Sequence, residues 1–182
     1  DYMTRAQQLD PGSMIINRDL ACVVSWIGRI DEAEQQLEKT IAMDPGFVPA
    51  YTHLGRIYAA RGQYEKALDR FETVKAIDPG FFNLDCHFGY TYGKMGRHED
   101  SRQMLEKMLA RQHTQQGKAA DIALVYLGMG HIDDAFEWYG KAVENREFAV
   151  ILIDVALWLE ELRPDPRFAE LRRKAGFPDR PN

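Results

Sequence analysis

Cysteine is scarce in this 182-residue chain, which contains only Cys22 and Cys86. The two residues lie far apart, and neither belongs to a Cys-x-x-Cys pair. The sequence therefore gives no support for a disulfide framework or for a zinc site built on thiolates. Such sparing use of cysteine fits a reducing compartment, and we expect a cytoplasmic location.

Long apolar runs and an excess of positive charge are also missing. The longest apolar run, Ala149 to Leu159, is interrupted by Asp154 and is too short to span a bilayer. The formal net charge is −5, and no block of like charge occurs. Because nucleic acids and anionic membranes attract basic surfaces, we expect neither of them as a partner.

The chain does contain a fixed period. Gly28, Gly62, Gly96 and Gly130 are spaced 34 residues apart, and each follows an amphipathic stretch. Glycine at such a place ends a helix, because it adopts left-handed backbone angles without strain. A second amphipathic stretch follows each glycine and begins with an acidic residue, as at Asp31. Acidic residues suit the positive end of a helix, so the period predicts a repeated helix-turn-helix unit.

Asp-Pro pairs separate the first of these units. Asp44-Pro45 and Asp78-Pro79 each close a second helix, and Asp10-Pro11 has the same form. Proline cannot continue a helix, so each pair marks a turn between repeats. Residues 1–13 thus resemble the end of a truncated repeat, and we expect the chain to be a piece of a longer protein. The third and fourth units lack the pair, which predicts looser boundaries there.

The second of these helix-turn-helix repeats carries a family resemblance over most of its length. Tyr51-Thr52-His53-Leu54-Gly55-Arg56-Ile57-Tyr58, then Gly62-Gln63-Tyr64-Glu65-Lys66-Ala67, then Phe71 and Asp78-Pro79 resemble a tetratricopeptide repeat. The resemblance implies an all-α fold, a right-handed α-solenoid of antiparallel helix pairs with about four 34-residue repeats and C-terminal capping helices. It implies repeats over 14–47, 48–81, 82–115 and 116–149, the last of them divergent. Such regions occur in larger bacterial proteins, often fused to kinase, cyclase or DNA-binding domains.

We call the first helix of each repeat helix A and the second helix B. Small residues such as Gly55 and Gly89 are expected to let helix A lie close to helix B of the same repeat. After the last repeat, residues 150–176 are expected to form a pair of capping helices, followed by a tail over 177–182. The first would be an apolar helix over Val150–Glu161. The second would be capped by Asp165, would start with Pro166 and would end at Gly176. Its charged residues suit an outer face: Arg167, Glu170, Arg172, Arg173 and Lys174.

Candidate chemistry is sparse. Equivalent places on successive helices A hold metal-ligand residue types: Asp19, His53, His87 and Asp121. The pattern suggests a metal site, but side chains one repeat apart are too distant to share an ion. We therefore interpret these residues as polar lining of the groove. Neither Cys22 nor Cys86 is expected to have the paired histidine that a nucleophile needs. No glycine-rich phosphate loop is present. The sequence therefore predicts no catalytic, cofactor-binding or metal-binding residues, and a protein that is not an enzyme.

The family resemblance implies a partner site on the concave surface, which helices A line. The matching positions are the candidate groove residues: Arg18, Trp26, Thr52, His53, Arg56, Asn83, His87, Tyr90 and Lys94. Trp26, near the end of its helix, suits either the groove or a wedge between repeats.

Two functions remain open. The first is a non-catalytic scaffold that binds a peptide or helix of a partner protein in the groove. The second is a structural or regulatory spacer within a larger multidomain protein, or a module that self-associates through the ends of the solenoid. Neither involves a small-molecule substrate.

Overall fold

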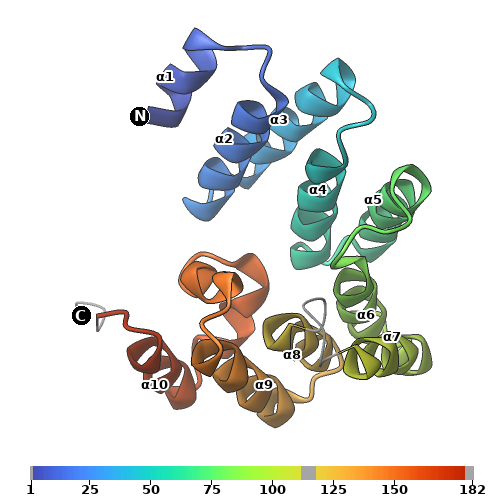
Figure 1. The fold of residues 1–182 in the computed structure, drawn as a ribbon, viewed down its shortest axis with the longest axis vertical. Helices are drawn as coiled ribbons and strands as arrows, with labels where there is room; N and C mark the ends of the chain where they lie inside the picture. Colours follow the sequence, from blue (N-terminus) through green and yellow to red (C-terminus); the bar gives the residue numbers. More distant parts are fainter. Residues whose placement is uncertain (1, 112–117, 179–182) are drawn as a thin grey trace. The chain divides into compact units, whose positions relative to one another are not determined.

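The computed structural model describes residues 2–111 and 118–178. Within these ranges every assigned element is a helix, so the predicted all-α fold is confirmed. Contacts divide the chain into two compact units, residues 1–81 and 82–182. Neighbouring helices in each unit form antiparallel hairpins, as expected for a helical-repeat solenoid (Figure 1). The repeat boundaries stay predictions, and the one between residues 115 and 116 lies outside the described residues.

The first unit contains α1 (Tyr2–Leu9), α2 (Met14–Trp26), α3 (Ile30–Met43), α4 (Val48–Ala60) and α5 (Tyr64–Ile77). The helices α2 and α3 form one hairpin, and α4 and α5 form the next, while α4 also packs on α3. In terms of the predicted repeats, α2 and α4 are helices A.

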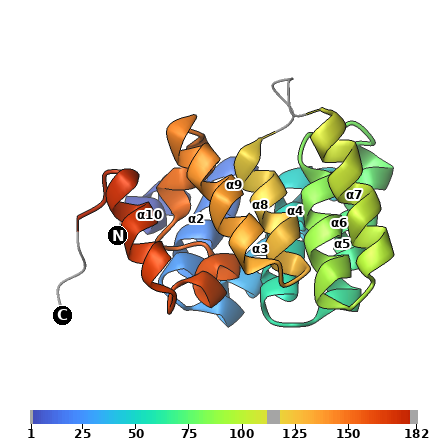
Figure 2. The same cartoon turned by 90° about the horizontal axis from the view of Figure 1, so that it is seen from below.

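The second unit begins with two further hairpins and ends in shorter elements. Its helices are α6 (Leu84–Lys94), α7 (His98–Ala110), α8 (Ala119–Gly128), α9 (Ile132–Glu144), the 3-10 helices η1 (Phe148–Leu152) and η2 (Leu157–Leu162), and α10 (Pro166–Lys174). In terms of the predicted repeats, α6 and α8 are helices A, and they lie side by side (Figure 2).

The four periodic glycines end the helices A as predicted. Their φ angles are positive, from 74° at Gly62 and Gly96 to 82° at Gly28. Around Gly62 the backbone N–H of Gln63 donates to the carbonyl of Tyr58 at 2.9 Å, and the N–H of Gly62 donates to Ala59 at 3.1 Å. This pair of bonds satisfies the last carbonyls of the helix and turns the chain into the next one.

The Asp-Pro turns hold their shape through the aspartate side chain. Oδ1 of Asp44 accepts a hydrogen bond from the backbone N–H of Gly46 at 2.8 Å. Oδ1 of Asp78 does the same with Gly80 at 3.0 Å. The aspartate thus closes a local turn while the proline after it prevents the helix from continuing.

The helix hairpin of α4 and α5 is as tight as the small residues predict. A Cβ atom on Gly55 would lie only 2.4 Å from Cε1 of Phe71, whose side chain is fully buried. In the second unit, a Cβ on Gly89 would lie 3.2 Å from Cβ of Met104 in α7 and 2.8 Å from Cγ2 of Val125 in α8. Gly89 therefore gives room both to its own helix B and to the next helix A.

A closer approach joins α6 to α8. A Cβ on Gly93 would lie 2.5 Å from the carbonyl carbon of Gly128, and a Cβ on Gly128 would lie 2.5 Å from the carbonyl oxygen of Tyr90. Both neighbours are backbone atoms, which cannot rotate away. Gly128 is not one of the four periodic glycines, and the contact with Gly93 gives a packing reason for it.

The short helix α1 is tied to its unit by one amide. Asn17 is 2% exposed, and its Nδ2 donates to the carbonyls of Pro11 at 2.9 Å and Ser13 at 2.8 Å. Its Oδ1 accepts from Nε2 of Gln7 in α1 and Nε2 of Gln36 in α3, both at 2.7 Å. No residue of α1 is buried, so this amide is a principal link between α1 and the body of the unit.

The expected apolar helix over Val150–Glu161 is wrong, because the chain there forms η1, a turn and η2. The reason is Asp154, whose carboxylate accepts from Nε and Nη2 of Arg172 at 2.6 and 2.8 Å. Arg163 donates from Nη2 to the carbonyls of Asp154 at 3.1 Å and Ala156 at 3.4 Å. These two arginines stabilise a bent backbone in place of a straight helix.

The expectation that Arg172 lies on an outer face is also wrong, because Arg172 is buried, with only 6% of its surface exposed. The final helix agrees with the sequence: Asp165 caps α10, Pro166 is its first residue, and Gly176 follows with φ 86°.

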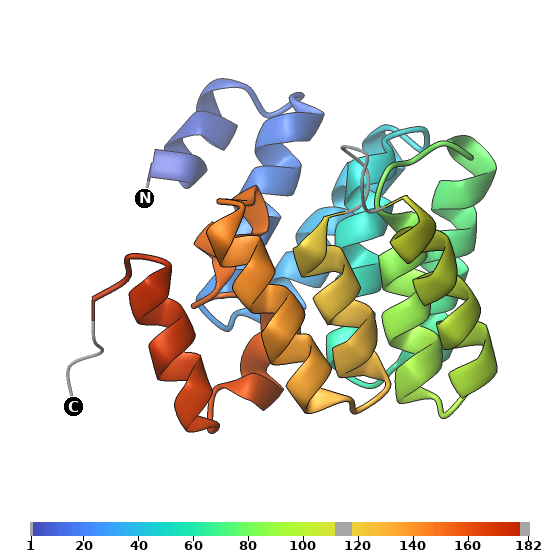
Figure 3. The ribbon, with the colours of Figure 1, turned by 60° about the horizontal axis from the view of Figure 1, so that its bottom comes forward.

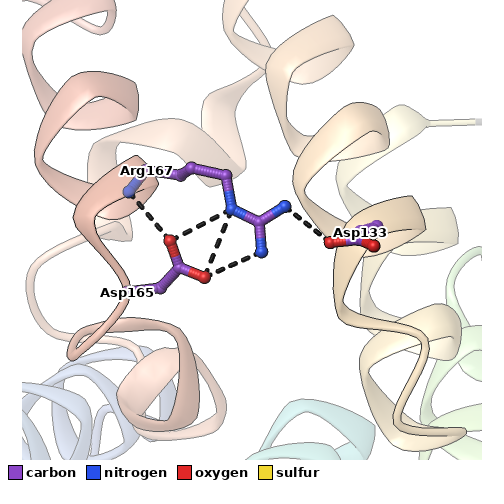
Figure 4. Close-up of polar contacts among 3 residues, drawn as sticks. All are labelled: Asp133, Asp165 and Arg167. Atoms are coloured by element: carbon purple, nitrogen blue, oxygen red, sulfur yellow. Dashed lines mark hydrogen bonds and ion pairs between the residues drawn. The ribbon is translucent and has the colours of Figure 1, made fainter.

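An ion-pair network fixes α10 against α9, beside which it lies in Figure 3. Nη1 of Arg167 donates to Oδ1 of Asp133 at 2.7 Å, and Nη2 donates to Oδ2 of Asp165 at 2.7 Å (Figure 4). The guanidinium group also lies 4.3 Å above the ring of Phe136. Hydrogen bonds from Arg167 lower the pKa of Asp165, so this cap stays ionised to more acidic pH.

Candidate partner-binding site

The candidate residues of the first unit lie on α2 and α4. Arg18 and Trp26 belong to α2, and Thr52, His53 and Arg56 belong to α4. Thr52 is 6% exposed and donates to the carbonyl of Val48 at 3.1 Å, so its hydroxyl is used inside the helix.

His53 is buried and makes contacts with two side chains of α2. Its Nδ1 lies 3.6 Å from Sγ of Cys22, and its Nε2 lies 3.3 Å from Oγ of Ser25. The hydroxyl of Ser25 donates to the carbonyl of Cys22 at 2.7 Å, which leaves Oγ as an acceptor. A neutral imidazole protonated at Nε2 fits this arrangement, donating to Ser25 and accepting from the thiol of Cys22.

The expectation that Cys22 lacks a paired histidine is therefore wrong. The pair is nevertheless held in the uncharged form. Burial, and then the positive charges of Arg56 and Arg18, lower the pKa of His53 to about 3. Burial raises the pKa of the Cys22 thiol. A cysteine nucleophile needs an accessible thiolate beside a cationic histidine, so this pair serves packing between α2 and α4.

Two arginines flank this buried contact. Arg18 lies one turn before Cys22 on α2, and Arg56 lies one turn after His53 on α4. Both side chains are half-buried, and Nη1 of Arg18 pairs with Oδ1 of Asp19 at 2.7 Å. Trp26 is 39% exposed at the end of α2. The accessible candidate residues of the first unit are thus two arginines, one of them paired with Asp19, and a tryptophan.

The candidate residues of the second unit follow one stripe of α6 from its cap to its end. His87 and Tyr90 are each 5% exposed, whereas Asn83 and Lys94 are half-buried. The ammonium of Lys94 lies 5.7 Å from the centre of the Tyr90 ring and 2.5 Å from Oε2 of Glu161 in η2. Sequence reasoning did not find Glu161, because 67 residues separate it from Lys94 and no motif connects them.

The structure thus divides the nine candidate residues by accessibility. Thr52, His53, His87 and Tyr90 are buried, which places them beneath the surface that a partner would meet. The accessible members are Arg18, Trp26, Arg56, Asn83 and Lys94. We call these five the accessible helix-A residues.

Residues 2–111 and 118–178 contain no group of three or more His, Cys, Asp or Glu residues that could hold a metal ion. In the same ranges no helix has both the length and the apolar character needed to cross a membrane.

Comparisons with known proteins agree with this architecture. Residues 27–84 match the model of the family described as tetratricopeptide repeat. No curated protein matches the chain.

Three solved structures share the fold. The chain is similar to YrrB, described as a TPR protein with an unusual peptide-binding site, with a TM-score of 0.55 and 17% identity over 96% of this chain and 91% of that one. A tetratricopeptide repeat protein from Parabacteroides merdae matches with a TM-score of 0.54 and 15% identity, over 96% of this chain and 64% of that one. Pseudomonas aeruginosa pilF matches with a TM-score of 0.52 and 19% identity, over 93% of this chain and 79% of that one.

Proposed function

The chain is a tetratricopeptide-repeat protein, and on that premise we propose that it binds a peptide or helix of a partner protein on its helices A. The fold is that of protein-interaction scaffolds, which are generally non-catalytic. The absence of a basic excess in a chain of net charge −5 favours a protein partner over nucleic acid or an anionic membrane.

One observation carries the proposal. The accessible helix-A residues include Arg18, Trp26, Arg56 and Lys94, and beneath those of the first unit the polar atoms of Thr52 and His53 are engaged in contacts within that unit. Arginine and tryptophan are enriched at sites that contribute most to protein binding. A rigid layer beneath them reduces the entropy lost when a partner binds. The similarity to YrrB, a protein with a peptide-binding site, supports the same class of ligand.

A peptide-library selection on the 182-residue chain tests this proposal. We expect enriched peptides whose binding weakens about tenfold when Arg56→Gln removes a charged donor. Trp26→Ala should weaken them by a similar factor. The matched control is Arg70→Gln, a half-buried arginine on α5, a helix B.

The control variant should bind like the unsubstituted chain. Enrichment of no peptide, or peptides equally insensitive to all three substitutions, contradicts binding on helices A.

A specific observation favours self-association as a second candidate. In α1 and the first turn of α2, Tyr2 is 94% exposed, Leu9 is 79% exposed and Ile15 is 60% exposed. In the apolar segment after α9, Phe148 and Ile151 are also exposed, at 72% and 55%, but Val150, Ile153 and Leu159 between and after them are buried. Self-association is therefore proposed for the α1 end. Sedimentation of the chain over a hundredfold concentration range tests it, and a Leu9→Ser, Ile15→Ser variant should remove any dimer.

A further inference from the structure

The ion pair between Lys94 and Glu161 joins two parts of the second unit that are distant in sequence. Nζ of Lys94, at the end of α6, lies 2.5 Å from Oε2 of Glu161 in η2. The lysine side chain is 18% exposed and that of the glutamate 48%. The ring of Tyr90, one turn earlier in α6, lies beside the ammonium and narrows the positions it adopts. Lys94 thus presents a positioned positive charge to which one carboxylate is already bound.

The fold of the C-terminal segment does not depend on Glu161. Leu159 and Leu162 are buried at 2% and 1% exposure and anchor η2 by packing. The backbone around Asp154 is held by Arg163 and Arg172. A partly exposed ion pair contributes little to stability, so its glutamate is free to exchange for another carboxylate at small cost.

We propose that Lys94 is a subsite for an acidic side chain of the partner segment, and that Glu161 is a built-in competitor for it. This inference rests on the proposed function, because it assumes that a partner lies on helices A. The occupant is a glutamate or aspartate in a peptide, the chemistry that the structure already places on this lysine. In the free protein Glu161 neutralises Lys94, and a binding partner displaces it.

The competitor has a measurable consequence. An intramolecular carboxylate lowers the apparent affinity of any ligand that needs the same ammonium group, because a fraction of the protein is occupied by its own side chain. Removing the carboxylate of Glu161 therefore tightens the binding of acidic partners, whereas removing the charge of Lys94 weakens their binding. The two effects are coupled, since without Lys94 the identity of residue 161 no longer matters.

The test uses peptides selected on the 182-residue chain, with dissociation constants measured by fluorescence anisotropy. Glu161→Gln should tighten binding roughly threefold, as expected for release of a partly exposed ion pair. Lys94→Gln should weaken it about tenfold, and the double variant should bind like Lys94→Gln alone. Glu160→Gln is the matched control, because the adjacent Glu160 pairs with Arg163 at 3.5 Å instead. Circular dichroism of each variant checks the fold, and Glu161→Ala provides a second substitution at the same site.

The outcomes separate this inference from the function on which it rests. Peptides that depend on Arg56 but contain no acidic residue, or whose affinity is unchanged by Glu161→Gln and Glu161→Ala, overturn the inference and leave the proposed function standing. Equal tightening by Glu160→Gln also overturns it, because the effect would then follow from net charge alone. A chain that enriches no peptide overturns both.

Discussion

The two units of the chain are built from similar hairpins but are held together in different ways. In the first, between α2 and α5, short-range devices set the geometry: glycine at Gly28 and Gly62, and the side chain of Asp44 folded over its own turn. In the second, backbone meets backbone at Gly93 and Gly128, and long side chains tie distant segments, as Arg172 ties Asp154. Local devices thus set the turns of the regular repeats, whereas the path of the irregular C-terminal segment depends on a contact between residues distant in the sequence.

Breaking the ion pair between Asp154 and Arg172 is the strongest expected disturbance of the second unit. Asp154→Ala leaves the guanidinium of a residue only 6% exposed without its carboxylate partner. Loss of one partner from a buried pair costs about 3 kcal/mol of unfolding free energy. Urea denaturation measures the cost. Glu170→Gln, which removes an exposed pair with Lys174, is the control and should leave the free energy of unfolding nearly unchanged. Equal effects of the two substitutions would contradict a structural role for Asp154.

Adding a methyl group to the α6–α8 contact is the next largest effect. In Gly93→Ala the new Cβ meets the carbonyl carbon of Gly128 at 2.5 Å, so the two helices must separate. Overpacking of this kind costs about 2 kcal/mol. Gly140→Ala in α9 is the matched control, because no atom lies within 4 Å of its added Cβ. It should stabilise the protein by about 0.8 kcal/mol through helix propensity. A Gly93→Ala variant as stable as Gly140→Ala would show that the α6–α8 approach is not tight.

Acid should weaken the first unit through His53. The pKa of His53 is about 3 in the folded chain, whereas an unfolded histidine has a pKa of about 6.5. The unfolded state therefore binds the proton more readily, and stability falls as the pH drops from about 6.5 toward 3. At pH 5 the loss is about 2 kcal/mol relative to neutral pH.

Urea midpoints between pH 7 and pH 4 test this dependence. His53→Gln should flatten the acid branch of the curve, and His98→Gln, at an exposed position, should keep it. An acid branch that is unchanged in His53→Gln would contradict the assignment.

The smallest predicted effect concerns the end of α9, a helix B that is followed by neither an Asp-Pro pair nor a glycine in the left-handed region. Arg146 has φ 54°, a left-handed angle that is strained for a residue with a Cβ. Arg146→Gly should therefore stabilise the protein by about 0.5–1 kcal/mol, whereas Gly28→Ala at φ 82° should destabilise it by about 1 kcal/mol. Thermal melting of the two variants gives the signs, and a lower melting temperature for Arg146→Gly would contradict the prediction.

The sequence is a good guide where structure is decided by neighbours in the chain. The periodic glycines, the cap of α10 at Asp165 and the need for a small residue at Gly55 all follow from local rules or from the repeat spacing. The bent segment between η1 and α10 does not, because its shape depends on Arg172, 18 residues after Asp154. From the sequence alone, an apolar run with one aspartate fits a straight helix as well as a bent segment, because the pairing of Asp154 with Arg172 is not visible in it.

The candidate site shows the same division. The sequence supplies the positions on helices A, but burial separates His53 and Tyr90 from Arg56 and Lys94, and burial depends on what packs above each residue. The contact between Cys22 and His53 spans 31 residues and the one between Lys94 and Glu161 spans 67, so neither appears as a motif.

The hydrogen bonds of Asn17 have a consequence for how the chain opens. An eight-residue helix is not stable alone, and α1 has no buried residue of its own. Its attachment relies heavily on one side-chain amide, so α1 should detach in a local opening far below the free energy of global unfolding. Trypsin would then cut after Arg5 while the rest of the first unit remains folded. Replacing Asn17 by Asp exchanges two donors for a charge and should turn that rare opening into the resting state.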